Sequence, residues 1–99
     1  MSVNVNSTEQ FDLLSEREQI QLVEWCKNLE KADKFNKNYT SYGLKHIFQY
    51  NGGFYVTNGA FKQAMLLAGF SHKECSSTIN WWFNVSRKSI KASLIRKRA

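Results

Sequence analysis

The sequence predicts one small α+β domain with three helices and a short antiparallel sheet. The chain has 99 residues, of which 42% are apolar and 22% charged, a globular balance with enough apolar material for one core. Helix-capping residues precede the apolar helical patterns, and residues 79–86 alternate strictly between inward and outward positions. We therefore expect a compact unit over residues 1–86, with residues 1–8 loose, followed by a basic tail over residues 87–99.

The first helix is expected from about Ser15 to Lys31. Ser15 and Glu18 have the spacing of a capping box, in which each side chain satisfies a backbone N–H of the first turn. Residues 11–14 should form a turn that leads into this helix. The charged segment Glu30–Asn38 is interpreted as either a fraying helix end or a loop. The apolar side of the helix consists of Ile20, Leu22, Val23, Cys26 and Leu29.

The second helix is expected to begin near Thr40 or Ser41 and to end at residues 51–53. Thr and Ser are common N-caps, and the two glycines of Asn51-Gly52-Gly53 are typical of the end of a helix. The following run Phe54-Tyr55-Val56 favours a short strand. We expect this run to pair with the alternating segment 79–86.

A third helix should run from Asn58 to about Ala68, capped by Thr57 and stopped by Gly69. At 100° per residue its side chains separate into two faces. The apolar face contains Ala60, Phe61, Ala64, Met65, Leu67 and Ala68. The polar face contains Asn58, Gly59, Lys62, Gln63 and Leu66. Leu66 is either a scattered surface leucine or a contact with a partner protein.

The segment after a loop over residues 71–78 predicts a half-buried strand. One face carries Ile79, Trp81, Phe83 and Val85, and the other carries Asn80, Trp82, Asn84 and Ser86. The order of helix, helix, short strand, helix and strand is similar to a winged helix, with the small strand placed between the second and third helices. The match is incomplete, because only one good strand follows the third helix. A non-winged α+β arrangement therefore stays open.

The charge of the chain is concentrated at its end. There are 14 basic and 8 acidic residues, a net charge of +6, while residues 1–86 carry equal numbers of each. The basic tail contains no acid and six cations: Arg87, Lys88, Lys91, Arg96, Lys97 and Arg98. This separation indicates a polyanionic partner, with a merely solubilising tail as the alternative.

The sequence does not favour an enzyme. No glycine-rich phosphate loop occurs, and no Ser, His and acid residues are placed as a triad. His72 and Cys75 are three residues apart but lack the further ligands of a zinc site, so no metal or other cofactor is expected. The sequence shows no secretory signal and no membrane span, so we expect a cytoplasmic protein in which Cys26 and Cys75 are reduced.

Nucleic acid is the favoured partner. The tail cations would hold phosphates and make binding depend steeply on salt. Trp82 projects among Asn80, Asn84 and Ser86 and would stack on an unpaired base, unless the tail or the N-terminal segment covers it. Asn58, Lys62 and Gln63 are residue types that give secondary contacts to bases or phosphates. We therefore predict a non-catalytic DNA-binding protein that contacts single-stranded DNA or acts in company with a replication enzyme.

A protein-binding module is the alternative. Leu66 and Trp82, if exposed, would form a docking surface for a larger enzyme. Such a protein would act as an inhibitor or adaptor of a polymerase or a host nuclease. An acidic DNA mimic is excluded by the positive charge of the chain.

The segments Ser41-Tyr-Gly-Leu-Lys-His46, Gly53-Phe-Tyr-Val-Thr-Asn-Gly-Ala-Phe-Lys-Gln-Ala-Met65 and Phe83-Asn-Val-Ser86 form a distinctive pattern. In this pattern the chain resembles small proteins encoded on bacterial mobile genetic elements. The group includes the small middle protein that accompanies the family-A polymerase of staphylococcal cassette chromosomes and assists its primase activity. The resemblance implies a role in mobile-element replication and carries no catalytic residues. Mobile elements also encode inhibitors of CRISPR nucleases, which keeps the protein-binding alternative open.

Overall fold

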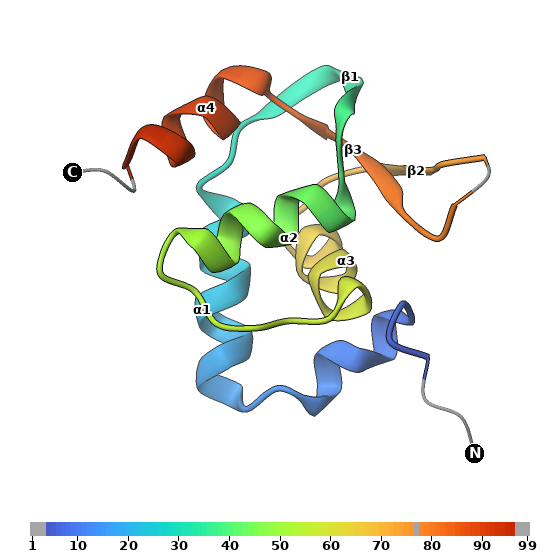
Figure 1. The fold of residues 1–99 in the computed structure, drawn as a ribbon, viewed down its shortest axis with the longest axis vertical. Helices are drawn as coiled ribbons and strands as arrows, with labels where there is room; N and C mark the ends of the chain where they lie inside the picture. The colour runs from blue at the N-terminus through green and yellow to red at the C-terminus, as the bar shows by residue number, and fades with distance from the viewer. Residues whose placement is uncertain (1–3, 77, 97–99) are drawn as a thin grey trace.

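The computed structural model describes residues 4–76 and 78–96 of the chain. Within these residues the structure is a small α+β domain with four α-helices, one 3₁₀ helix and a three-stranded antiparallel sheet (Figure 1). The elements follow in the order η1 (Thr8–Leu13), α1 (Glu16–Lys27), β1 (Lys31–Thr40), α2 (Ser41–Tyr50), α3 (Asn58–Leu67), β2 (His72–Glu74), β3 (Trp81–Val85) and α4 (Arg87–Arg96).

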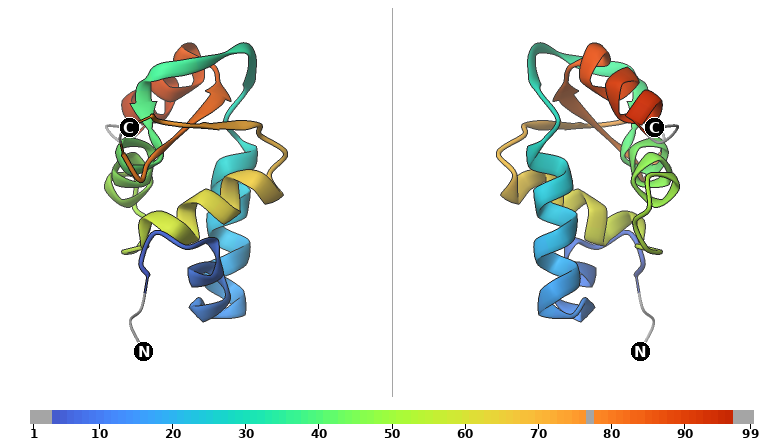
Figure 2. Two further views of the ribbon diagram at one scale, coloured as in Figure 1. Left: turned by 90° about the vertical axis from the view of Figure 1, so that its right-hand side faces the viewer. Right: turned by 90° about the vertical axis from the view of Figure 1, so that its left-hand side faces the viewer.

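The sheet has the strand order β1-β3-β2, so the last strand in the sequence lies in the middle. Lys31 pairs with Val85 and Thr40 with Trp82 across β1 and β3, with two register irregularities between them. Helices α1, α2 and α3 lie below the sheet, while α4 lies beside β1 at the upper end of the molecule (Figures 1 and 2). One face of the sheet therefore covers the helices, and the other faces away from them.

The predicted starts of the first three α-helices are confirmed. Ser15 accepts the Glu18 N–H, while the Glu18 carboxylate accepts the Ser15 N–H, which completes the capping box. Thr40 and Thr57 cap α2 and α3 by accepting the N–H groups of Gly43 and Ala60. These contacts involve residues three positions apart, and this is why a sequence pattern can reveal them.

The prediction that Glu30–Asn38 is a helix end or loop was wrong, because residues 31–40 form β1. Only Asn36 of this strand is buried, so the segment lacks the apolar alternation that identifies a strand. Its conformation depends on pairing with β3, 41 or more residues away, through Ser86 N–H donating to the Glu30 carbonyl at 2.8 Å and Asn36 Nδ2 donating to the Val85 carbonyl at 3.3 Å.

The predicted strand at residues 54–56 is absent, and the position expected for it beside β3 is taken by β1 and β2. Val56 is buried instead, and its N–H donates to Gln49 Oε1. Conversely, the predicted loop 71–78 contains β2, whose side chains are all exposed. The sequence predicts one strand between the second and third helices. In the structure the first strand, β1, instead lies between α1 and α2, and the two strands β2 and β3 follow α3.

The core lies between the inner face of the sheet and the helices. Its fully buried side chains include Leu22, Leu44, Phe48, Phe61, Met65 and Phe83. Ile90 of α4 also belongs to this core and is completely buried. The boundary predicted at residue 86 therefore falls inside the packed structure, because the apolar side of α4 continues the core.

The segment just before η1, which was expected to be loose, packs on the start of α3. The Val5 carbonyl accepts the Gly59 N–H at 2.9 Å, and a Cβ placed on Gly59 would overlap the Ser7 carbonyl. Glycine is therefore required at position 59 by close approach of two backbones rather than by a positive φ. This contact buries the first turn of α3.

Candidate nucleic-acid interface

The outer face of the sheet carries an aromatic side chain and basic residues. Trp82 pairs with Thr40 of β1 on one side and with Lys73 of β2 on the other. Directly paired residues of an antiparallel sheet project from the same face. Phe83 and Val85 are buried on the inner face, so Trp82, Thr40 and Lys73 share the face that points away from the core.

Trp82 is half-buried. The Nζ atom of Lys37 lies 5.1 Å from the centroid of the ring, within the range of a cation–π contact. Lys37 and Lys73 are both exposed and belong to the two strands that flank β3. The Trp82 indole thus lies beside two lysines, on the central strand of the sheet.

The indole of the neighbouring Trp81 packs against other side chains of the domain. His72 stacks on it with centroids 3.8 Å apart and planes 18° apart, and Lys62 Nζ lies 4.7 Å from its centroid. The backbone N–H of Trp81 also donates to Ser41 Oγ at 3.1 Å. The two adjacent tryptophans therefore have different surroundings, because successive side chains of a strand point to opposite faces.

The basic segment after β3 forms α4. Arg87, Lys88 and Lys91 are exposed, whereas Ile90 anchors the helix in the core. Ser86 Oγ accepts the Ser89 N–H at 3.2 Å and so caps the start of the helix. Cations in the first turn of a helix oppose its dipole at a cost of about 0.3–1 kcal/mol each, so helix stability does not account for Arg87 and Lys88.

The other three cations of the tail lie at the end of α4 and beyond it. Arg96 is the last residue of α4, and Lys97 and Arg98 lie outside the residues that the structure describes. The basic tail is therefore an ordered helix over Arg87–Arg96, with three of its six cations placed on the surface.

The expected polar face of α3 is largely covered, so the prediction of an exposed face was wrong. Asn58 is only 5% exposed, and its Nδ2 donates to both Asn6 Oδ1 and Asn80 Oδ1 at 3.0 Å. Lys62 is 4% exposed and donates to the carbonyls of Ile79 at 2.6 Å and Asn6 at 3.3 Å. A helical wheel cannot anticipate this covering, because it comes from residues at least 17 positions away.

Burial lowers the pKa of Lys62, and the neighbouring Glu74 and Cys75 act in the opposite direction. Lys62 therefore acts as a structural link between the N-terminal segment and the loop before β3. Gln63 is half-buried and is the remaining polar candidate on this helix.

The two leucines near the end of α3 exchange their expected places. Leu66 is half-buried, whereas Leu67, expected in the core, is 52% exposed. The helix is packed on several sides, so its buried surface is wider than one apolar stripe. A partner-contact role for Leu66 remains a prediction, and the more exposed leucine is Leu67.

No family model, curated protein or solved structure matches this chain. Its function is therefore inferred from the residues and their arrangement. The resemblance to mobile-element proteins, which stays a prediction, covers about residues 41–90 and so includes α2, α3, β2, β3 and the start of α4. This stretch contains Trp82 and Lys73 of the outer sheet face, whereas the lysines of β1 lie outside it.

In the part of the chain that the structure describes, exposed bases and acids are concentrated on different elements. Among residues 31–94, seven exposed cations accompany two exposed carboxylates. Elements η1 and α1 carry five acids and two bases. Figure 1 places β1 and α4 at one end of the long axis and η1 at the other. The exposed cations are Lys31, Lys34, Lys37, Lys73, Arg87, Lys88 and Lys91.

Lys34, Lys37 and Lys73 were missed by the sequence analysis. The first two lie in the charged segment that was interpreted as a helix end or loop, and Lys73 lies in the supposed loop after α3. Lys31, Lys34 and Lys37 recur every three residues, and this cluster of bases is visible in the sequence. Recognising that these side chains belong with Trp82 required the strand pairing.

The structure offers little for a metal site or a reactive thiol. In residues 4–76 and 78–96, no three His, Cys, Asp or Glu side chains gather closely enough to hold a metal ion. Cys26 is fully buried, and burial raises the pKa of its thiol, so it stays protonated. No helix in the described part of the chain is long and apolar enough to cross a bilayer.

Proposed function

We propose that this protein is a non-catalytic accessory protein that binds single-stranded DNA through the outer face of its sheet. The observation that carries the proposal is the half-buried Trp82, with Lys37 Nζ 5.1 Å from its ring centroid and Lys73 paired beside it. An aromatic ring within a basic groove or face is the arrangement that single-stranded nucleic acids use, since every base has a flat surface to stack.

The backbone of the DNA would be held by lysines of the sheet and cations of α4. Arg87 follows Trp82 by five residues, a reach of at most roughly 17 Å along an extended chain. A strand stacked on Trp82 could therefore extend to Arg87, Lys88 and Lys91. The positive end of the α4 dipole, at its N-terminus, also favours a bound phosphate. Phosphate binding would therefore account for Arg87 and Lys88 in a first turn where cations lower helix stability.

The winged-helix assignment is part of this proposal. It is supported by the order helix, strand, helix, helix, strand, strand from α1 to β3, and by the position of β3 between β1 and β2. In helix-turn-helix proteins the second helix of the motif reads DNA. Here the first turn of α3 is covered by the chain itself, so we assign DNA contact to the sheet and α4.

An accessory role fits a protein that supplies binding to a separate catalytic partner. The resemblance of about residues 41–90 to mobile-element proteins supports a polymerase-primase as that partner. We include this replication setting in the proposal, since single-stranded DNA is the template on which such enzymes act.

The proposal is tested by fluorescence anisotropy with labelled oligothymidylate about 20 nucleotides long at low salt. We expect binding whose logarithm falls linearly with log salt, and weaker binding to a duplex of the same length. The substitution Trp82→Ala should remove about 1–3 kcal/mol of stacking, a loss of roughly 5- to 150-fold in affinity. The substitution Lys37→Ala should lower the slope of the salt dependence by roughly 0.7.

The matched control is Lys27→Ala, which removes the same charge from the last turn of α1, outside the sheet. It should leave the affinity and the salt slope unchanged, and circular dichroism should confirm that each variant is folded. Equal losses from Lys27→Ala and Lys37→Ala would show that net charge alone drives binding. That result, or no binding of the oligonucleotide at low salt, would refute the proposed interface.

A further inference from the structure

Aromatic side chains gather on the exposed side of α2 and on the segment that follows it. Tyr42, His46 and Tyr50 are spaced four residues apart, which places them in one stripe along the helix. Tyr42 is 51% exposed, Tyr50 is 57% exposed, and Tyr55 of the following segment is 73% exposed. We call these four residues, Tyr42, His46, Tyr50 and Tyr55, the tyrosine face.

A buried lysine lies beside two of these rings. Lys45 is only 5% exposed, and its Nζ lies 5.3 Å from the ring centroid of Tyr42 and 5.0 Å from that of Tyr55. The same atom donates to Gln49 Oε1 at 3.2 Å. The ring of His46 packs edge-on against Tyr42, with centroids 4.4 Å apart. Rings that are already held by packing lose less conformational freedom when a ligand stacks on them.

The tyrosine face begins close to Trp82. Thr40, which pairs with Trp82 across the sheet, is two residues before Tyr42. Paired Cα atoms are about 4.5–5.5 Å apart, and each residue advances the chain by at most about 3.6 Å. The Cα atoms of Trp82 and Tyr42 therefore lie within roughly 13 Å of each other.

The other end of the tyrosine face meets α4. Figure 2 shows α2 and α4 next to each other. A hollow of about 600 Å³ between them is lined by four residues: His46, Ile47, Tyr50 and Leu94. Lys91 is exposed and lies one turn before Leu94 on α4. The tyrosine face thus connects Trp82 with the cations of α4, the two parts of the proposed DNA surface.

The charge around the tyrosine face suits a polyanion. Residues 34–73 and 75–99 contain no Asp or Glu, so α2, the segment after it and α4 have no carboxylate side chain. Exposed aromatic rings with cations and without acids are typical of surfaces on which single-stranded nucleic acids stack. A basic protein segment would be repelled, and an uncharged one would gain little from the cations.

We propose that the tyrosine face is a second stacking surface for single-stranded DNA, along which the strand follows α2 from Trp82 to α4. This inference rests on the proposed binding of single-stranded DNA at Trp82 and extends it to a longer strand. Further bases stack on Tyr42, Tyr50 or Tyr55, and phosphates lie near Lys91. Helix α2 has 10 residues and is about 15 Å long, so the path accommodates several nucleotides.

The test measures the affinity of the full-length chain for labelled oligothymidylate of about 20 nucleotides by fluorescence anisotropy at low salt. Tyr42→Ala and Tyr50→Ala should each weaken binding roughly fivefold or more, since each removes a stacking ring. The matched controls are Tyr42→Phe and Tyr50→Phe, which keep the rings and should bind within about twofold of the unmodified chain. Circular dichroism should confirm that every variant is folded.

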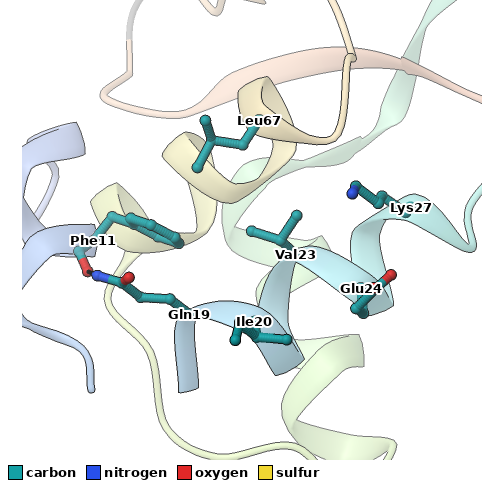
Figure 3. Close-up of a pocket in the computed structure, with 7 residues that line it drawn as sticks. All are labelled: Phe11, Gln19, Ile20, Val23, Glu24, Lys27 and Leu67. Carbon is teal, nitrogen blue, oxygen red and sulfur yellow. Dashed lines mark hydrogen bonds between the residues drawn. The ribbon is translucent and has the colours of Figure 1, made fainter. Parts of the chain in front are cut away.

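A further control removes a large exposed side chain outside the proposed path. Leu67 is 52% exposed and borders a hollow between η1, α1 and α3, where it faces Val23 (Figure 3). Glu24 and Lys27 border the same hollow and carry opposite charges. Leu67→Ala should leave the affinity for oligothymidylate unchanged.

Photocrosslinking tests the path on the unmodified protein. An oligothymidylate in which iodouracil replaces some thymines crosslinks to aromatic side chains that its bases contact. Mass spectrometry of the digested complex should find crosslinks to Tyr42, Tyr50 or Tyr55 as well as to Trp82.

The outcomes separate this inference from the function on which it rests. If Trp82→Ala weakens binding while Tyr42→Ala and Tyr50→Ala do not, or if crosslinks form to Trp82 alone, the tyrosine face is overturned and the proposed interface stands. If the Phe variants lose as much affinity as the Ala variants, stacking on these rings is overturned. If Trp82→Ala binds as the unmodified chain does, the interface at Trp82 is refuted, and the path from Trp82 along α2 is refuted with it.

Discussion

Gly59→Ala tests how the N-terminal segment is held on α3. The Gly59 position has no room for a methyl group, because its Cβ would overlap the Ser7 carbonyl. Backbone atoms of the segment would have to move to accept it. Gly59 lies in the first turn of α3 and does not have a positive φ, so alanine is acceptable to the helix itself.

The expected magnitude follows from the contacts that the movement breaks. These are the Val5 carbonyl to the Gly59 N–H at 2.9 Å, the Asn6 carbonyl to Lys62 at 3.3 Å, and Asn6 Oδ1 to Asn58 at 3.0 Å. At about 1 kcal/mol each, their loss costs about 3 kcal/mol. The better helix propensity of alanine returns about 1 kcal/mol, so we expect a net destabilisation of about 2 kcal/mol.

Urea unfolding followed by tryptophan fluorescence measures this change. Gly43→Ala is the matched control, because Gly43 lies in the first turn of α2 and its Cβ would meet only Thr40 Oγ1 at 4.0 Å. That substitution should raise the free energy of unfolding by about 0.5–1 kcal/mol. The two glycine substitutions should therefore have opposite signs.

Deleting residues 1–7 separates the steric cause from helix propensity. In the shortened chain Ser7 is gone, so Gly59→Ala should become stabilising by about 0.5–1 kcal/mol, as expected for Gly43→Ala. A Gly59→Ala variant as stable as the unmodified full-length chain would refute the close packing of the N-terminal segment. An unchanged destabilisation after the deletion would refute Ser7 as its cause.

Other substitutions test the buried polar contacts. Lys62→Met should cost about 2 kcal/mol in urea unfolding, because it leaves two carbonyls without their donor. Lys45→Met should change the free energy of unfolding by less than about 1 kcal/mol. Lys45 is a buried cation that donates to Gln49 Oε1, and its burial, which lowers its pKa, offsets part of what this contact contributes. A loss as large as that of Lys62→Met would contradict this ranking. The lowered pKa of Lys62 means that the unfolded chain keeps its proton to higher pH, so stability should rise with pH just below the usual lysine pKa, and less so in Lys62→Met. Ser15→Ala should cost about 1 kcal/mol by removing the capping box, and no change in the thermal midpoint would show that the box is dispensable.

Several helix boundaries could be predicted from the sequence because their causes are local. Ser15 with Glu18, Thr40 with Gly43, and Thr57 with Ala60 are contacts within one helical turn. Gly69 ends α3 with a φ of 96°, as the residue order alone suggested, and the Phe70 N–H donates to the Met65 carbonyl. The alternation around Phe83 and Val85 likewise predicted β3.

The candidate site was predicted only in part. The sequence identified Trp82 and the cations at Arg87, Lys88 and Lys91, because an aromatic on a strand and a run of bases are visible in the residue order. It did not identify Lys37 or Lys73 as neighbours of Trp82. Those residues reach it through pairing of strands separated by whole helices.

The sequence by itself determined the start of each capped helix and the positive end of the chain. Only the tertiary structure decided that residues 31–40 form a strand and that Asn58 and Lys62 lie inside. It also decided that the basic residues separate from the acidic end of α1. The physical reason is range: capping and periodicity act within a few residues, whereas strand pairing and the burial of a polar face depend on groups brought together by the whole chain.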